Sequence, residues 1–181
     1  MPNFISEDQI EKAIVIVFVN NLGYRHLNCL DADTTGRTKE NEVVIKSVLR
    51  ELLHKLNKTL PATAIDFALE QLTQSNIDAT DFFANKEFYN LIKNGVPLKI
   101  TNAQGKEEDA IAKVIDFDDE TQNDYLIVTQ LWVQGQFIRR RPDIIVFVNG
   151  LPLVFIELKN SNIDLLNAYD DNLLNYRKDI M

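Results

Sequence analysis

The sequence contains little of what several classes of protein need. Its 181 residues include one cysteine, Cys29, so a fold held by internal disulfides is excluded. No apolar stretch reaches the roughly 18 residues that a membrane-spanning helix requires. The first eight residues hold two acids and no base, unlike the start of a secretory signal peptide. Together these features predict a protein of the reducing cytoplasm.

Positive charge is also in short supply. The chain has 19 Lys and Arg residues against 27 Asp and Glu residues, a formal net charge of -8. Composition alone therefore argues against a protein that coats nucleic acid electrostatically. Hydrophobic residues make up 45% of the chain and charged residues 25%, which is typical of a globular protein. We expect a single domain that needs no metal or disulfide in order to fold.

Helical patterns come first along the chain. Ser6 is a favourable N-cap and Gly23 a favourable C-terminal residue, so a helix is expected from about Glu7 to Leu22. Its later part is β-branched, which favours a strand by propensity, but length and caps favour a deeply buried helix. A loop at 31–38 follows. Further helices are expected over Glu40–Leu56, from Pro61 to about residue 74, over Phe82–Ile92, and over Ile163–Tyr176.

The hydrophobic period changes after Gly95 and becomes typical of strands. Trp132 falls within one of these segments and is expected to belong to the core. Helices followed by strands with short turns predict an α/β domain with a mixed, largely antiparallel sheet. The expected strands are Val96–Thr101, Ala110–Phe117, Tyr125–Gln134, Asp143–Val148 and Leu153–Lys159.

The last two of these segments form a predicted hairpin, because they flank the turn dipeptide Asn149-Gly150. With a three-residue loop, Asp143 would lie opposite Glu157, their Cβ atoms about 4.5–5.5 Å apart. A two-residue loop would shift the pairing by one residue unless a bulge near Pro152 restored it. Either loop brings two carboxylates to the open end of the hairpin.

Lys159 lies two residues beyond Glu157 and would project to the same face. Both strands are otherwise apolar on both faces, which predicts a central hairpin with cover on each side. Charges at the end of such a hairpin are costly unless they are paired or bind a metal. Two interpretations stay open: a salt bridge that closes the hairpin, or a Mg²⁺ site. In the second, Asp143, Glu157 and the main-chain carbonyl of Leu158 would hold the ion, and Lys159 would act on a water molecule or on the transition state.

The residues of this segment resemble a known family. Pro142-Asp143, then thirteen intervening residues, then Glu157-Leu158-Lys159, is similar to the PD-(D/E)xK nuclease motif. The segments 140–143, 148–153 and 156–160 resemble the N-terminal nuclease domain of the R (restriction) subunit of type I restriction enzymes. The resemblance extends to the first helix and, less specifically, to the helical middle of the chain.

This resemblance implies a restriction-endonuclease-like (PD-(D/E)xK) α/β fold, a central mixed sheet flanked by helices, as one nuclease domain over residues 1–181. It implies a Mg²⁺-dependent type I site-specific deoxyribonuclease that cuts duplex DNA non-specifically, at sites remote from the recognition sequence, after ATP-driven translocation. The partners implied are double-stranded DNA and the modification and specificity subunits, with no membrane. An ATP-dependent translocase follows the nuclease in that family, and the abrupt end at Met181 is expected for a fragment of a longer subunit.

The family also carries a glutamate in its first helix. Glu7 and Glu11 both qualify, and Glu11 is preferred because it lies nearer the apolar part of the helix, whereas Glu7 can serve the cap. A family Q-x-x-x-Y motif corresponds to Asn172 and Tyr176, with the shorter Asn in place of Gln. Tyr176 is expected to support the site or contact DNA, or to lie half-buried in the core.

Three consecutive arginines come directly before the acidic pair and are expected to grip phosphates beside the cut. They are Arg139, Arg140 and Arg141. Two other functions stay open: a stand-alone repair or junction nuclease of the same fold, and an inactive nuclease fold that serves as a docking module. The intact Asp143, Glu157 and Lys159 argue against the docking module.

Overall fold

The computed structural model describes residues 5–74, 81–102, 104–135 and 138–159. The chain forms two compact units. The first comprises residues 1–43, 125–147 and 151–181, and the second comprises residues 44–124 and 148–150. Among the described residues, no helix is long and apolar enough to cross a membrane. Cys29 is a buried free thiol, as its isolation in the sequence indicates.

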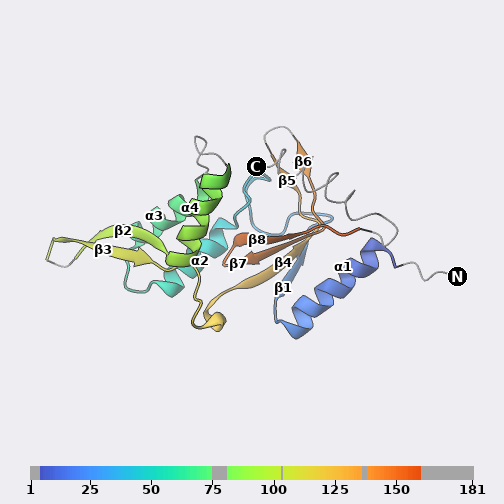
Figure 1. Ribbon diagram of the computed structural model, residues 1–181, viewed down its shortest axis with the longest axis horizontal. Coiled ribbons are helices and arrows are strands. Elements are labelled where there is room, and N and C mark those ends of the chain that lie inside the picture. The colour runs from blue at the N-terminus through green and yellow to red at the C-terminus, as the bar shows by residue number, and fades with distance from the viewer. Residues whose placement is uncertain (1–4, 75–80, 103, 136–137, 160–181) are drawn as a thin grey trace. The chain divides into compact units, whose positions relative to one another are not determined.

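The first unit is built on a four-stranded sheet with the strand order β1-β4-β7-β8 (Figure 1). Its strands are β1 (Arg25–Asn28), β4 (Tyr125–Thr129), β7 (Ile144–Val148) and β8 (Leu151–Ile156). β1 is parallel to β4, with Arg25 beside Leu126. The main-chain N–H of Gln130, after β4, donates to the carbonyl of Asp143, before β7, so these strands run in opposite directions. The predicted α/β architecture with a mixed sheet is therefore confirmed.

Helix α1 (Glu7–Ile16; Figure 1) begins where the sequence predicts. Its start is a capping box. Ser6 Oγ accepts the main-chain N–H of Gln9, and the Gln9 side chain accepts the main-chain N–H of Ser6. A π-helical turn, Val17–Asn21, continues the helix, and Gly23 follows with φ +73°. One face of the helix packs on the sheet core through Ile10, Ile14, Val15 and Phe18.

The expectation that this helix is deeply buried is wrong. None of its residues is fully buried, and the Ile16 and Val17 residues are 56% and 48% exposed. Only one stripe of a helix can contact a sheet, so a segment that is apolar all round leaves some of its side chains outside that contact.

The second unit contains α2 (Lys46–Leu56), α3 (Ala62–Thr73), α4 (Asp81–Asn94), β2 (Val96–Thr101) and β3 (Glu107–Ala112). All three helices and the two strands were expected, but α2 begins at Lys46, six residues after the expected start at Glu40. The main-chain N–H of Ile45 donates to the carbonyl of Gly150 rather than to a carbonyl of a preceding helical turn, so the helix begins only after Ile45. β3 also pairs through 107–112 rather than 110–117, since its register is set by β2.

The expected strand Tyr125–Gln134 is divided into two. Gln130 has φ +57°, a left-handed conformation that interrupts a strand, so β4 ends at Thr129. After the break, β5 (Val133–Gln134) pairs with β6 (Arg139–Arg140) in a separate antiparallel ribbon. The sequence patterns indicate neither this ribbon nor β1, because all three of these strands have four residues or fewer.

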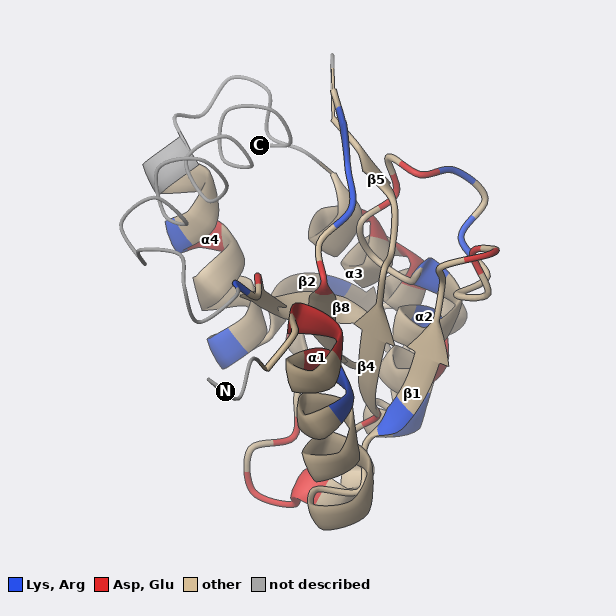
Figure 2. Cartoon of the chain, turned by 90° about the vertical axis from the view of Figure 1, so that its right-hand side faces the viewer, with Lys and Arg blue, Asp and Glu red and all other residues tan. Residues whose placement is uncertain are grey.

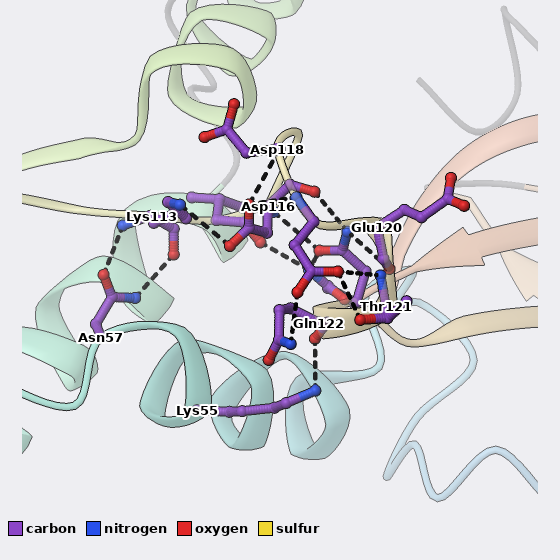
Figure 3. A network of polar contacts seen from close by, with 12 residues as sticks. Lys55, Asn57, Lys113, Asp116, Asp118, Glu120, Thr121 and Gln122 are labelled. Atoms are coloured by element: carbon purple, nitrogen blue, oxygen red, sulfur yellow. Dashed lines mark hydrogen bonds and ion pairs between the residues drawn. The ribbon is translucent and has the colours of Figure 1, made fainter.

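Several acidic residues of the second unit form hydrogen bonds that stabilise the loop before β4 (Figure 3). Asp119 caps the short 3-10 helix Glu120–Gln122 by accepting from Thr121. Hydrogen bonds from the main chain of Asp119 and from Lys113 hold the pKa of Asp116 below its usual range. The Asn57 side chain joins α2 to the main chain of Lys113. Some of the acidic residues that give the chain its negative net charge, such as Asp116 and Asp119, therefore stabilise this loop.

Candidate active site

The hairpin of β7 and β8 turns through two residues. Asn149 and Gly150 have φ values of +53° and +81°, the pattern of a type I′ turn. The three-residue loop considered from the sequence is therefore wrong, and β8 begins directly at Leu151. The side chain of Asn149 is fully buried and donates to the carbonyl of Val114 at 2.8 Å. The turn is thus held by buried hydrogen bonds as well as by its own conformation.

The open end of the hairpin brings three charged residues together. Asp143 Oδ2 accepts the main-chain N–H of Leu158 at 2.7 Å. The Asp143 carboxylate therefore lies against the backbone between Glu157 and Lys159. Lys159 Nζ donates to Glu157 Oε1 at 3.4 Å. The side chains of Lys159 and Glu157 are 23% and 14% exposed, so the pair is largely shielded from water.

This setting raises the pKa of Glu157. Burial raises the pKa of Glu157 above its ordinary value of 4.5, and the nearby Asp143 charge raises it further. The Lys159 ammonium lowers the pKa of Glu157 but does not cancel these two effects. Two acids that repel one another in a shielded place favour binding of a proton or of another cation.

The raised pKa predicts a variant that is more stable than the wild type. The folded protein binds a proton at Glu157 more readily than the unfolded chain does, so stability falls as the pH rises from 4.5 through the raised value. Above that interval the ionised Glu157 destabilises the fold. Glu157→Gln should therefore raise the midpoint of thermal unfolding at neutral pH, measured without metal. The gain should shrink towards pH 4. A variant that is less stable than the wild type at neutral pH would contradict this.

One expectation about the hairpin is wrong. β7 is buried on both faces, as predicted, but β8 is the edge strand of the described sheet, and its residues 153–155 are exposed. The apolar residues of β8 are therefore not covered on both faces by described residues.

The two candidate glutamates of α1 have different surroundings. Glu11 Oε2 accepts the side-chain amide N–H of Gln130 at 2.6 Å. Gln130 is also the residue whose main-chain N–H contacts the Asp143 carbonyl. Glu7 lies in the first turn of the helix, beside the Ser6 cap. Glu11 is thus linked through one residue to the start of β7, and its role as a site residue stays a prediction.

The arginines before Asp143 are not equivalent (Figure 2, where the basic stretch beside β5 is blue). Arg139 forms a bidentate ion pair with Glu40 and lies 4.0 Å over the Trp132 ring. Arg141 lies 5.1 Å from the same ring, and no described carboxylate pairs with it. Trp132 was expected in the core, but it is half-buried outside the strands and stacks against both guanidinium groups.

The family of the chain is decided by comparison with known proteins. A sequence model described as "Type I restriction enzyme R protein N terminus" matches residues 4–181. The chain belongs to this family. The relationship covers the hairpin, α1 and the second unit, and so includes every residue described above.

Two R-subunit relatives show the extent of the match. The chain is 38% identical over 132 residues to the type I restriction enzyme HindI endonuclease subunit of Haemophilus influenzae, which covers 71% of the chain and 12% of that protein. It is 30% identical over 179 residues to a Methanocaldococcus jannaschii protein provisionally named the type I restriction enzyme MjaIXP endonuclease subunit, which covers 93% of the chain and 17% of that protein. The chain spans less than a fifth of either relative.

Some residues predicted from the R-subunit resemblance lie outside the described part of the structure. These are Asn172 and Tyr176, together with the expected helix Ile163–Tyr176. Within the described residues, no group of three or more His, Cys, Asp or Glu side chains could hold a metal ion. A cation at the hairpin end would therefore have two carboxylates, Asp143 and Glu157, and main-chain oxygen as its described ligands.

Two residues near Glu11 could not be identified as neighbours of the candidate site from the sequence patterns of this R-subunit domain. Gln130 has no motif around it, and it is found only through its hydrogen bonds. His26 belongs to no recognisable motif either, and its Nε2 contacts Thr129 Oγ1 at 3.1 Å. Burial lowers the pKa of His26, and the Glu11 charge offsets part of this effect. His26 is therefore close enough to Glu11 to sense its charge.

Proposed function

We propose that the chain is a Mg²⁺-dependent nuclease domain with the PD-(D/E)xK fold, and that it hydrolyses phosphodiester bonds of duplex DNA. The observation that carries the proposal is the contact of the Asp143 carboxylate with the Leu158 N–H, between Glu157 and Lys159. This contact occurs in a chain of the R-subunit N-terminal family. The family relationship favours this function over a stand-alone repair nuclease or a docking module.

The residues at the hairpin end fit a magnesium ion. Mg²⁺ prefers oxygen ligands, usually one or two carboxylates and several waters. Asp143 Oδ2 is engaged by the Leu158 N–H, whereas no described residue donates to Oδ1. Glu157 Oε2 is buried, and burial together with the Asp143 charge disfavours the negative charge of Glu157. Asp143, Glu157 and the Leu158 carbonyl would hold the ion, which when bound supplies positive charge that polarises a phosphate oxygen and a water.

Lys159 contributes the positive charge that the chain itself supplies. Its ammonium group is held by Glu157 and is largely shielded from solvent, so its charge acts strongly on nearby oxygens. Lys159 either positions the attacking water or neutralises negative charge on the phosphate in the transition state. Both roles require the amine at the hairpin end, where Asp143 and Glu157 are found.

The partners follow from the family and are part of the proposal. The chain would act within a longer R subunit whose ATP-driven translocase moves DNA, with modification and specificity subunits that select the target. Cutting at remote sites then needs no base recognition by this domain. Tethering also supplies a high effective concentration of DNA, which makes a net charge of -8 compatible with the function. The buried lone thiol supports a reducing cytoplasm as the compartment.

The proposal is tested on the complete protein assembled with its modification and specificity subunits. Wild-type complex should cut circular plasmid DNA in the presence of ATP and Mg²⁺. EDTA would also stop ATP hydrolysis, so the informative variant is Asp143→Asn. This complex should hydrolyse ATP at the wild-type rate and leave the plasmid uncut. Wild-type cleavage by Asp143→Asn would overturn the proposed function.

The unequal arginines give a further prediction. Arg141, two residues before Asp143 and without a described acidic partner, should contact a DNA phosphate, whereas the Arg139 charge is already paired with Glu40. Arg141→Ala should raise the KM for DNA about fivefold to tenfold and reduce the dependence of binding on salt by about one ion. Arg139→Ala is the matched control. It should lower thermal stability through loss of the Glu40 and Trp132 contacts while changing the salt dependence little. Equal salt dependence of wild type and Arg141→Ala would refute the assignment.

A further inference from the structure

The backbone conformation of Gln130 is unusual for its residue type. Its φ of +57° lies in the left-handed region, which favours Gly, Asn and Asp. Asn149 is the other described non-glycine residue with a positive φ, and it belongs to the type I′ turn where this conformation is normal. Gln130 lies in no such turn dipeptide. Strained residues of this kind persist where surrounding contacts fix them, often near functional sites.

The main chain of Gln130 is held by Asp143, the residue directly before β7. Its N–H donates to the carbonyl of Asp143 at 3.0 Å. This bond holds the position after β4 against the position before β7, and Asp143 is the residue whose carboxylate is proposed to bind the metal. The left-handed conformation also ends β4, so the Gln130 side chain leaves the alternation of the strand.

The side chain of Gln130 reaches α1. Its Nε2 donates to Glu11 Oε2 at 2.6 Å, a partly buried hydrogen bond between residues 119 positions apart. Among the described residues, Gln130 is the one that hydrogen-bonds to the Glu11 carboxylate. The orientation of Glu11 therefore depends on this amide, and hydrogen bonds to a charged group are stronger than neutral ones.

We propose that Gln130 is a positioning residue of the nuclease site, which aligns Glu11 of α1 with Asp143 through one side-chain and one main-chain hydrogen bond. The proposal rests on the proposed nuclease function. Outer residues that orient site carboxylates commonly change metal affinity or activity by 10- to 100-fold when they are altered. Gln130 acts through Glu11, so its loss should affect turnover rather than DNA binding.

The test variant is Gln130→Gly in the complete, assembled protein. Glycine adopts the positive φ without strain and keeps the N–H that contacts Asp143, so only the amide to Glu11 is lost. We expect kcat for plasmid cleavage to fall about tenfold, with an unchanged KM for DNA and an unchanged or higher midpoint of thermal unfolding. Gln130→Asn, which tolerates the same φ and keeps an amide, should recover part of the rate. Gln134→Ala, which removes an amide that donates to the carbonyl of Gly135, is the matched control.

A double-mutant cycle with Glu11→Ala separates positioning from a structural role. If Gln130 acts through Glu11, the double variant should cleave no more slowly than Glu11→Ala alone. Wild-type kcat in Gln130→Gly, or independent effects of the two substitutions, would overturn the inference. Asp143→Asn is measured in parallel. If it is inactive while Gln130→Gly is normal, only this inference fails; if it cleaves like the wild type, the nuclease proposal fails and this inference with it.

Discussion

Asp143→Ala, Glu157→Ala and Lys159→Ala should each reduce DNA cleavage by the assembled protein by about 10³-fold or more. Asp143→Ala removes the carboxylate that accepts the Leu158 N–H. Glu157→Ala removes the shielded carboxylate, and Lys159→Ala removes the ammonium group that pairs with it. Groups that act as a unit lose most of their effect when any one member is removed. Cleavage is measured as the rate of conversion of supercoiled plasmid to linear product.

The controls for this prediction come from elsewhere in the chain. Asp118→Ala, Glu51→Ala and Lys58→Ala remove exposed charges of the same types in the second unit. These variants should cut at the wild-type rate. ATP hydrolysis should be normal in all six complexes, which shows that the site variants are folded and assembled. If Glu157→Ala or Lys159→Ala retained wild-type cleavage, the role given to that residue would be lost.

The hairpin could be predicted from the sequence because two apolar runs flank a turn dipeptide and charged residues stand at their outer ends. The approach of Asp143 to Glu157 and Lys159 followed from that pattern, although the assumed three-residue loop was wrong. Loop length depends on whether both turn residues adopt positive φ, and Asn149 and Gly150 both do. The buried bonds of the Asn149 side chain support this conformation, and they involve residues 114 and 123, which are distant in sequence. Local pattern therefore predicted that these charged residues meet at the end of the hairpin, but not the length of its turn.

The surroundings of the other candidate residues depend on contacts between distant segments. Helical periodicity placed Glu7 and Glu11 on one face of α1 and could not choose between them. The bond from Gln130 distinguishes their surroundings, and it joins residues that no local pattern relates. The break in the strand at Gln130 is equally hidden, because glutamine carries no signal for a positive φ. Arg139 and Arg141 look alike in sequence, and only the ion pair with Glu40 separates them. The helices α3 and α4 were predictable because their apolar stripes and flanking residues are local features.

The hairpin turn itself gives the largest expected effect on stability. Gly150 has φ +81°, and a Cβ built on it would lie 2.6 Å from the carbonyl oxygen of Ile45 and 2.9 Å from the main-chain nitrogen of Leu49. Neither backbone atom can move easily, because the Ile45 carbonyl accepts the first hydrogen bond of α2, from that same Leu49 nitrogen. Gly150→Ala should therefore lose both the left-handed conformation and the close packing against the start of α2.

Gly105 provides a matched control for this substitution. It has a similar φ of +76° in the turn between β2 and β3, and no atom lies within 4 Å of its built Cβ. Gly105→Ala should cost only the conformational penalty, about 1–2 kcal/mol. Gly150→Ala should cost about 3 kcal/mol or more in the free energy of unfolding, measured by denaturant titration, because the steric clash adds to the same penalty. Equal losses in the two variants would show that the approach of Gly150 to α2 contributes nothing to stability. A larger loss at Gly150 would show that the tip of the hairpin carrying Asp143 and Glu157 is held by close packing as well as by its own turn.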